Sequence, residues 1–148
     1  SNTPFRGGRT ETYEGGIRTA CVVRWPARFK AGTVCREPVA NIDFLPMLLA
    51  AAGIKPPPDR VIDGRDPTAT LADQAPSPHE NLFFEFRRWA GVRSGRWKIV
   101  RSRPDRPFEL YDLKTDWAES RNLAAEKPSI RRRLTEAFSE WRGSVTNR

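Results

Sequence analysis

The sequence predicts an α+β fold in which a C-terminal helix packs on a four-stranded antiparallel sheet. Two observations lead to this prediction. Four short segments between residues 82 and 113 are rich in β-branched and aromatic residues, and turns separate them. The segment from Pro128 to Arg142 then repeats apolar residues at helical spacing. The chain has 148 residues, of which 38 % are hydrophobic and 30 % charged, as expected for one soluble globular domain.

A glycine-rich segment, residues 5–18, precedes these elements and reads Phe-Arg-Gly-Gly-Arg-Thr-Glu-Thr-Tyr-Glu-Gly-Gly-Ile-Arg. Paired glycines allow a positive φ or a close backbone approach. The segment therefore either links two strands or aims a cation at an anion. The apolar run from Thr19 to Trp25 predicts a buried strand that contains Cys21, and residues 33–36 predict a short edge strand. A disulfide between Cys21 and Cys35 stays open.

Residues 41–52 predict a helix with Asn41 or Asp43 as its cap, Pro46 in its first turn and Gly53 after its end. Its apolar stripe is expected in the core and comprises Phe44, Leu45, Leu48, Leu49 and Ala52. Residues 54–78 are expected to be irregular. Their aspartates lack the spacing of a calcium loop and are interpreted as solvated. The only histidine, His79, is expected to be structural or solvated.

The predicted strands of the sheet cover residues 82–86, 89–93, 96–101 and 108–113, with a hairpin turn at Ser94 and Gly95. Pro128 suits the first position of the last helix, and Gly143 is expected to end it. One face of this helix is apolar and should pack on the sheet as a second layer. It comprises Ile130, Leu134, Ala137, Phe138 and Trp141.

Several of these segments resemble the arylsulfatase family of the alkaline phosphatase-like superfamily. The glycine-rich segment is similar to R-G-G-K-x-x-T-Y-E-G-G-I-R, and residues 42–53 are similar to I-D-x-L-P-x-L-L-x-x-A-G. Gly91–Ile99, Glu109–Leu113 and Asn122–Ala124 resemble the motifs A-V-R-x-G-x-W-K-L, E-L-Y-D-L and N-L-A. The resemblance implies that residues 1–78 are the C-terminal remnant of a large α/β catalytic domain, containing one strand and one helix, and that residues 79–148 form a small subdomain. It also implies that the chain is either the C-terminal part of a longer protein or a fragment encoded alone.

The resemblance implies one site residue. In the family, the lysine of the glycine-rich segment contacts the sulfate of the substrate, and that position is Arg9 here. A guanidinium can hold a sulfate through two parallel N–H bonds. The family nucleophile is a formylglycine made within a C/S-x-P-x-R motif. Residues 102–106 match this motif but lie between two predicted strands, so we set them aside. No catalytic or metal-binding residue is therefore expected in this chain.

We expect a C-terminal region of a sulfatase that completes the sulfate pocket and does not hydrolyse sulfate esters alone. An N-terminal catalytic portion would bring calcium and formylglycine, the substrate would be a sulfated small molecule or glycan, and a typical bacterial sulfatase would be periplasmic or secreted. Two alternatives are a phosphate mono- or diester hydrolase of the same superfamily and a basic module that binds polyanions, because the net charge is +8. Core positions for Trp97 and Trp141 argue against nucleic acid. No apolar run reaches the length of a membrane span.

Overall fold

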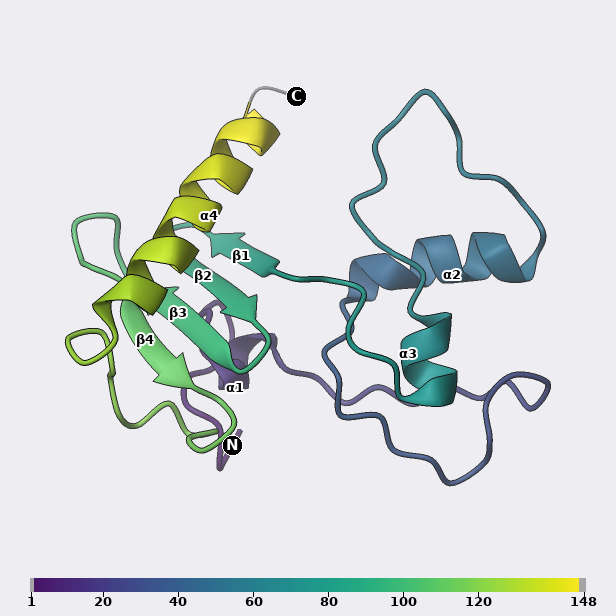
Figure 1. Ribbon diagram of the computed structural model, residues 1–148, viewed down its shortest axis with the longest axis horizontal. Coiled ribbons are helices and arrows are strands. Elements are labelled where there is room, and N and C mark those ends of the chain that lie inside the picture. The colour runs from purple at the N-terminus through teal and green to yellow at the C-terminus, as the bar shows by residue number, and fades with distance from the viewer. Residues whose placement is uncertain (1, 147–148) are drawn as a thin grey trace. The chain divides into compact units, whose positions relative to one another are not determined.

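The computed structural model describes residues 2–146 and divides the chain into two compact units. The first unit holds the chain up to Ala20 and again from Asn81 onward, and the second unit is Cys21–Glu80. This division differs from the expected one between residues 78 and 79, because the glycine-rich segment packs with the sheet rather than with the residues that follow it. Figure 1 shows the helices and strands of each unit.

The sheet of the first unit has four antiparallel strands in the order β1-β2-β3-β4. These are β1 (Leu82–Phe86), β2 (Trp89–Ser94), β3 (Trp97–Arg101) and β4 (Glu109–Asp112). The predicted α+β fold with its antiparallel meander is confirmed, and each predicted strand agrees with the observed one within two residues at either end. Gly95 has a φ of +54° in the turn between β2 and β3, a conformation that glycine adopts without strain.

The long helix α4 (Pro128–Thr146) covers one face of the sheet. Its side chains Leu134 and Phe138 are buried in a core with Val92, Ile99 and Leu110, which lie opposite one another on adjacent strands. The apolar face predicted for this helix is confirmed. Its predicted end is wrong, because the helix passes through Gly143 to Thr146. One glycine costs a helix only about 1 kcal/mol and does not stop it.

The opposite face of the sheet is covered too. The glycine-rich segment, with the one-turn helix α1 (Glu14–Ile17), lies there (Figure 1). Tyr13 from this segment packs in a second apolar cluster with Val100, Tyr111 and Leu113. The sheet therefore lies between α4 and the glycine-rich segment, and the expected two layers are three.

The second unit contains short helices: η1 (Asn41–Asp43), α2 (Phe44–Ala51) and α3 (Thr68–Asp73). No strand is formed in it among the described residues, so the strands expected at 19–25 and 33–36 are wrong. A β-branched run becomes a strand only beside a pairing partner, and Val22 and Val34 are instead 95 % and 70 % exposed. Cys21, expected in the core, is exposed, and both cysteines are free thiols.

Helix α2 keeps Pro46 in its first turn, as predicted, and Gly53 follows its end with a φ of +69°. The expected burial of its apolar stripe is wrong: Leu45 and Leu48 are 52 % and 61 % exposed, whereas Met47 is buried. Helix α3 was not predicted, since it falls in the proline-rich stretch that reads as irregular. The second unit thus exposes apolar side chains that a larger core would cover.

Candidate functional site

The glycine-rich segment forms a loop that closes on itself. Gly15 N donates to Arg6 O at 2.8 Å, and Gly8 N donates to the Glu11 carboxylate at 2.9 Å. A Cβ on Gly15 would lie 2.5 Å from Gly7 O, and one on Gly16 would lie 2.1 Å from Glu11 O. Gly15 and Gly16 are therefore required by close backbone approach, and Gly7 is favoured by its φ of +79°, which together fix the course of the loop.

The loop is fastened to the sheet by side chains that lie between its two glycine pairs. Thr12 Oγ1 donates to the backbone carbonyl of Ala90 at 3.0 Å. The hydroxyl groups of Tyr13 and Tyr111 each donate to Glu109 Oε2 at 2.6 Å. Burial, together with the bond to Glu109, raises the pKa of both tyrosines, so their hydroxyls stay protonated as donors.

Arg6 also attaches the loop to the sheet. Its guanidinium lies 4.1 Å from the centre of the Tyr13 ring and donates to Tyr111 Oη at 2.8 Å and to Glu119 O at 2.9 Å. It also lies 4.0 Å from Glu109 Oε2. Arg6 is therefore a structural cation that joins the loop to β4 and to the segment after it.

A buried cluster of charges lies beneath the loop. Lys98 Nζ donates to Glu14 Oε1 at 2.9 Å and forms an ion pair with Glu119 Oε1, also at 2.9 Å. Glu119 Oε2 accepts from the backbone N of Glu14 at 2.7 Å. The side chains of Lys98 and Glu119 are fully buried, and burial raises the pKa of Glu119. Removing either partner would leave a buried charge without compensation, so this cluster holds the loop firmly.

Two further arginines complete the cluster at its edge. Arg18 and Arg93 lie 3.7 and 3.6 Å from Glu14 Oε2. Arg18 also lies over the rings of Phe5 and Trp117, at 4.7 and 5.5 Å from their centres. Arg18 is thus an anchor of the loop.

Arg9, the one predicted site residue, differs from these neighbours. It is exposed, and among residues 2–146 it forms no hydrogen bond, ion pair or ring contact. The loop around it is fixed, whereas its own guanidinium is free to bind an external anion. The supporting residues Arg6, Glu14, Lys98 and Glu119 were missed from the sequence. One signal in the sequence could have indicated this cluster. Lys98 lies between Trp97 and Ile99 in a strand, so its side chain points to the opposite face from theirs, which is the face that bears Tyr111.

The other candidates from the sequence, residues 102–106 and His79, belong to other segments of the chain. Residues 102–106, which match the motif of the family nucleophile, lie between β3 and β4 as expected, and they are not part of the glycine-rich segment. His79 Nε2 is 2.6 Å from Asp43 Oδ1, and the Asp43 carboxylate also accepts the backbone N–H groups of Ala40 and Arg65. This buried pair ties two segments of the second unit together, which agrees with the structural role expected for His79.

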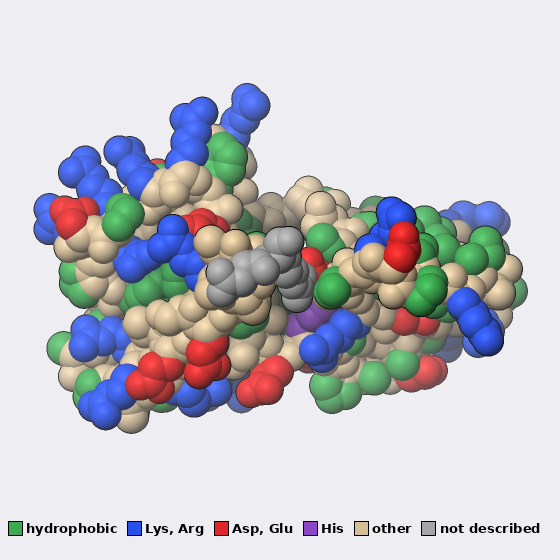
Figure 2. Space-filling model, turned by 90° about the horizontal axis from the view of Figure 1, so that it is seen from above, with side chains coloured by type: hydrophobic (Ala, Val, Ile, Leu, Met, Phe, Trp, Pro, Cys, Tyr) green, Lys and Arg blue, Asp and Glu red, His purple; other side chains and the backbone are tan. Residues whose placement is uncertain are grey.

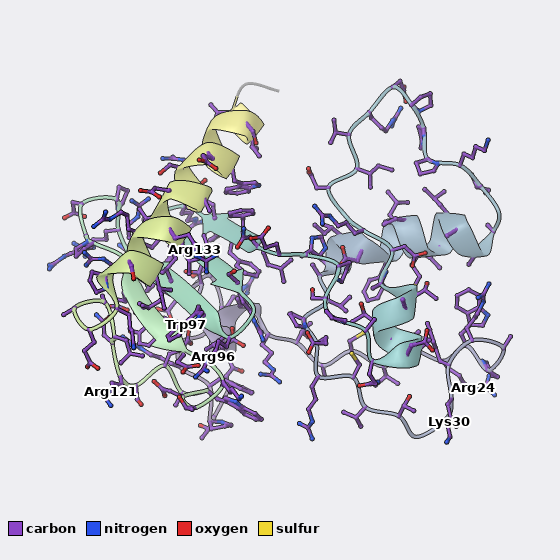
Figure 3. The ribbon with its side chains drawn as sticks, viewed as in Figure 1. Arg24, Lys30, Arg96, Trp97, Arg121 and Arg133 are labelled. Atoms are coloured by element: carbon purple, nitrogen blue, oxygen red, sulfur yellow. The ribbon has the colours of Figure 1, made fainter. Side chains whose placement is uncertain are left out.

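No group of three or more His, Cys, Asp or Glu side chains that could hold a metal ion occurs in the described part of the chain. Among the same residues, no helix is long and apolar enough to cross a membrane. Figure 3 labels Arg96 at the turn between β2 and β3. Its guanidinium forms a bidentate pair with the Asp112 carboxylate, which holds the pKa of that carboxyl below its usual value.

The family model for the C-terminal region of N-sulphoglucosamine sulphohydrolase matches residues 9–143. The chain belongs to this sulfatase family. Over 124 residues, which are 84 % of the chain and 24 % of the relative, it is 30 % identical to N-acetylgalactosamine-6-sulfatase of Mus musculus. Over 84 residues, which are 56 % of the chain and 14 % of the relative, it is 46 % identical to steryl-sulfatase of Mus musculus.

The fold of the chain is also similar to that of a solved structure. It comes from work on the metabolism of multiple glycosaminoglycans by Bacteroides thetaiotaomicron, and it superposes with a TM-score of 0.76 at 27 % identity. The match covers 97 % of this chain and 32 % of that one. The sulfatase C-terminal region described here therefore spans under a third of the length of these relatives.

Proposed function

We propose that this region completes the sulfate pocket of a sulfate-ester hydrolase, with Arg9 as its sulfate-binding residue. The observation that carries the proposal is the contrast within one loop. Arg6 and Arg18 are held by partners inside the unit, whereas Arg9 is exposed and free on a backbone fixed by the buried cluster. A fixed loop with one free cation is suited to hold an anion that arrives from outside.

Arg9 would bind and orient the sulfate rather than take part in proton transfer. The guanidinium stays protonated at any working pH, and its planar N–H groups match two oxygens of an oxyanion. A hydrogen bond to a charged partner contributes about 1.5–3 kcal/mol. Arginine is thus able to perform the binding role of the family lysine, but not any step in which that lysine would have to lose a proton.

The remaining chemistry is assigned to an N-terminal catalytic portion. The described residues contain no carboxylate cluster that fits calcium, and the match to C/S-x-P-x-R at residues 102–106 lies in a turn of the sheet. We therefore assign no step through calcium or formylglycine to this chain. The nucleophile, the metal ligands and the proton donor for the leaving group would all come from the partner portion.

We propose a sulfated glycan as the substrate class. The support is the family itself, named for a sulphohydrolase that acts on N-sulphoglucosamine, and the relative that matches over 84 % of the chain, an N-acetylgalactosamine-6-sulfatase. The similarity to steryl-sulfatase covers only 56 % of the chain and favours a sulfated small molecule less strongly.

The proposal that this chain is not a complete catalyst is tested on the purified 148-residue protein. We expect no hydrolysis of an aryl sulfate above the buffer rate, with or without added calcium, since a single binding cation does not assemble a reacting site. A turnover that Arg9→Ala abolishes would contradict the proposal. An aryl phosphate assayed in parallel tests the phosphate-ester alternative.

A further inference from the structure

A hollow of about 630 Å³ lies at one flank of α4, on the first unit. The loop between β3 and β4 contributes Ser102, Arg103 and Arg106 to its wall, and α4 contributes Arg131. Asn122 lines it from the segment before the helix. Three guanidinium groups from two separate parts of the chain therefore face one concave surface.

A second hollow, of about 570 Å³, follows the first along the same helix and shares Phe108 with it. Arg101, at the end of β3, lines it together with Thr135, Ser139 and Arg142 of α4. Because residues four apart lie on one side of a helix, Arg131, Thr135 and Ser139 form a continuous row. We call the two hollows together the arginine-lined flank.

The charges of this flank are largely uncompensated. Within the described part of the chain, the side chains of Arg103, Arg106 and Arg131 form no hydrogen bond or ion pair. Glu109 is the one carboxylate in the first hollow, and it already accepts the hydroxyl groups of two tyrosines. Figure 2 shows many Lys and Arg side chains over the part of the molecule that holds the sheet and α4.

The second hollow is basic as well. No carboxylate lines it, although Arg142 pairs with Glu85 at 3.1 Å. Arg101 has a buried Nε without a hydrogen-bond partner, and its guanidinium lies 4.6 Å from the centre of the Phe108 ring. Because this Nε is buried, an anion in the hollow would be held by the outer nitrogens of the Arg101 guanidinium, which form no hydrogen bond or ion pair among the described residues.

We infer that the arginine-lined flank binds a linear sulfated glycan, in addition to the sulfate held by Arg9. Planar guanidinium groups suit sulfate oxygens, and two successive hollows suit several anionic groups along one chain. The location rests on the lining residues alone, whereas the choice of sulfate as the anion rests on the proposed function. Nucleic acid fits less well, because Phe108 and Phe138 are 6 % and 2 % exposed and offer no ring for base stacking.

The test is a titration of the full chain with a fluorescent heparin oligosaccharide. The flank variant is Arg103→Gln/Arg106→Gln/Arg131→Gln, and the control is Arg88→Gln/Arg132→Gln/Arg133→Gln, which removes the same charge outside the hollows. We expect the flank variant to raise the Kd about tenfold or more and the control to change it by less than about threefold. The double variant Arg103→Gln/Arg106→Gln, which alters only exposed side chains, should show most of the effect if the triple variant folds poorly.

Two further arms make the result decisive. Arg9→Gln with the flank intact reports on the sulfate role of Arg9, and the flank variant with Arg9 intact reports on the hollows, so a failure of the proposed sulfate role and a failure of this site appear in different variants. A single-stranded DNA oligomer of matched charge should compete less well than heparin. Equal losses in the flank and control variants would overturn the site, because net charge alone would then explain binding. Equal competition by DNA would overturn the choice of a glycan.

Discussion

Lys98 is the second residue of β3, and its side chain is fully buried. It is placed between Glu14, from the glycine-rich segment, and Glu119, from the segment after β4. Residues far apart in the sequence therefore meet at one ammonium group. Because a buried ion pair is strongly sensitive to the loss of one partner, Lys98 is the residue on which the position of the loop depends most.

We predict that Lys98→Met destabilises the protein by about 3–5 kcal/mol, since it leaves two buried carboxylates without their cation. Chemical denaturation followed by circular dichroism measures the change. Lys114→Met, at an exposed lysine in the same unit, is the matched control and should cost about 0.5 kcal/mol or less.

A second variant tests the cause. Lys98→Met/Glu119→Gln removes one of the two carboxylates and leaves Glu14 to its pairs with Arg18 and Arg93. It should therefore be more stable than Lys98→Met alone. If the double variant is less stable than the single one, then the cost comes from lost packing and not from unpaired charge.

The sequence predicted the binding residue of the candidate site but not the residues that hold its loop in place. Arg9 was reached through the order of residues in a family motif, and its free position is compatible with that role. The residues that hold the loop around Arg9 were not predicted. Lys98 and Glu119 come together only in the folded unit, where different segments cover the two faces of the sheet. A lone lysine between apolar residues in a strand signals an inward charge, but it does not identify the carboxylates that meet it.

At the scale of elements, the strands and the last helix were predictable because each carries a local periodic signal. The alternation in β1 to β4 and the stripe on α4 were both found. Segments without such a signal were missed or wrongly assigned. Helix α3 is only six residues long, and the run from Thr19 to Trp25 has strand propensity but no partner strand among the described residues.

Helix α4 should contribute much of the stability of the first unit. Leu134 is fully buried against the sheet, so we predict that Leu134→Ala lowers the free energy of unfolding by about 2–5 kcal/mol. Arg132→Ala, on the exposed side of the same helix, should change it by about 0.5 kcal/mol or less. Thermal or urea unfolding measures both variants. Equal losses would show that the packed face has been assigned wrongly.

At the scale of the whole molecule, the two units differ in how well they enclose their apolar side chains. The first unit has a core on each face of its sheet. The second unit exposes Val22, Leu45, Leu48 and Val61. This difference is expected if the second unit belongs to the edge of a larger catalytic domain, as the family resemblance implies. We propose that residues of such a domain would cover the apolar stripe of α2, whose helical pattern is correct although Leu45 and Leu48 are exposed here.

The central claim is that Arg9 binds the sulfate of the substrate. The direct measurement is kcat/KM for a sulfate ester with variants of a full-length sulfatase that carries this region, with folding checked by circular dichroism. We predict that Arg9→Ala lowers kcat/KM by about one to two orders of magnitude, which corresponds to the loss of one charge-assisted bond. Arg9→Lys should retain much of the activity, and Arg18→Ala should lower stability more than catalysis. An unchanged kcat/KM in Arg9→Ala would show that Arg9 is only a surface cation and would contradict the account.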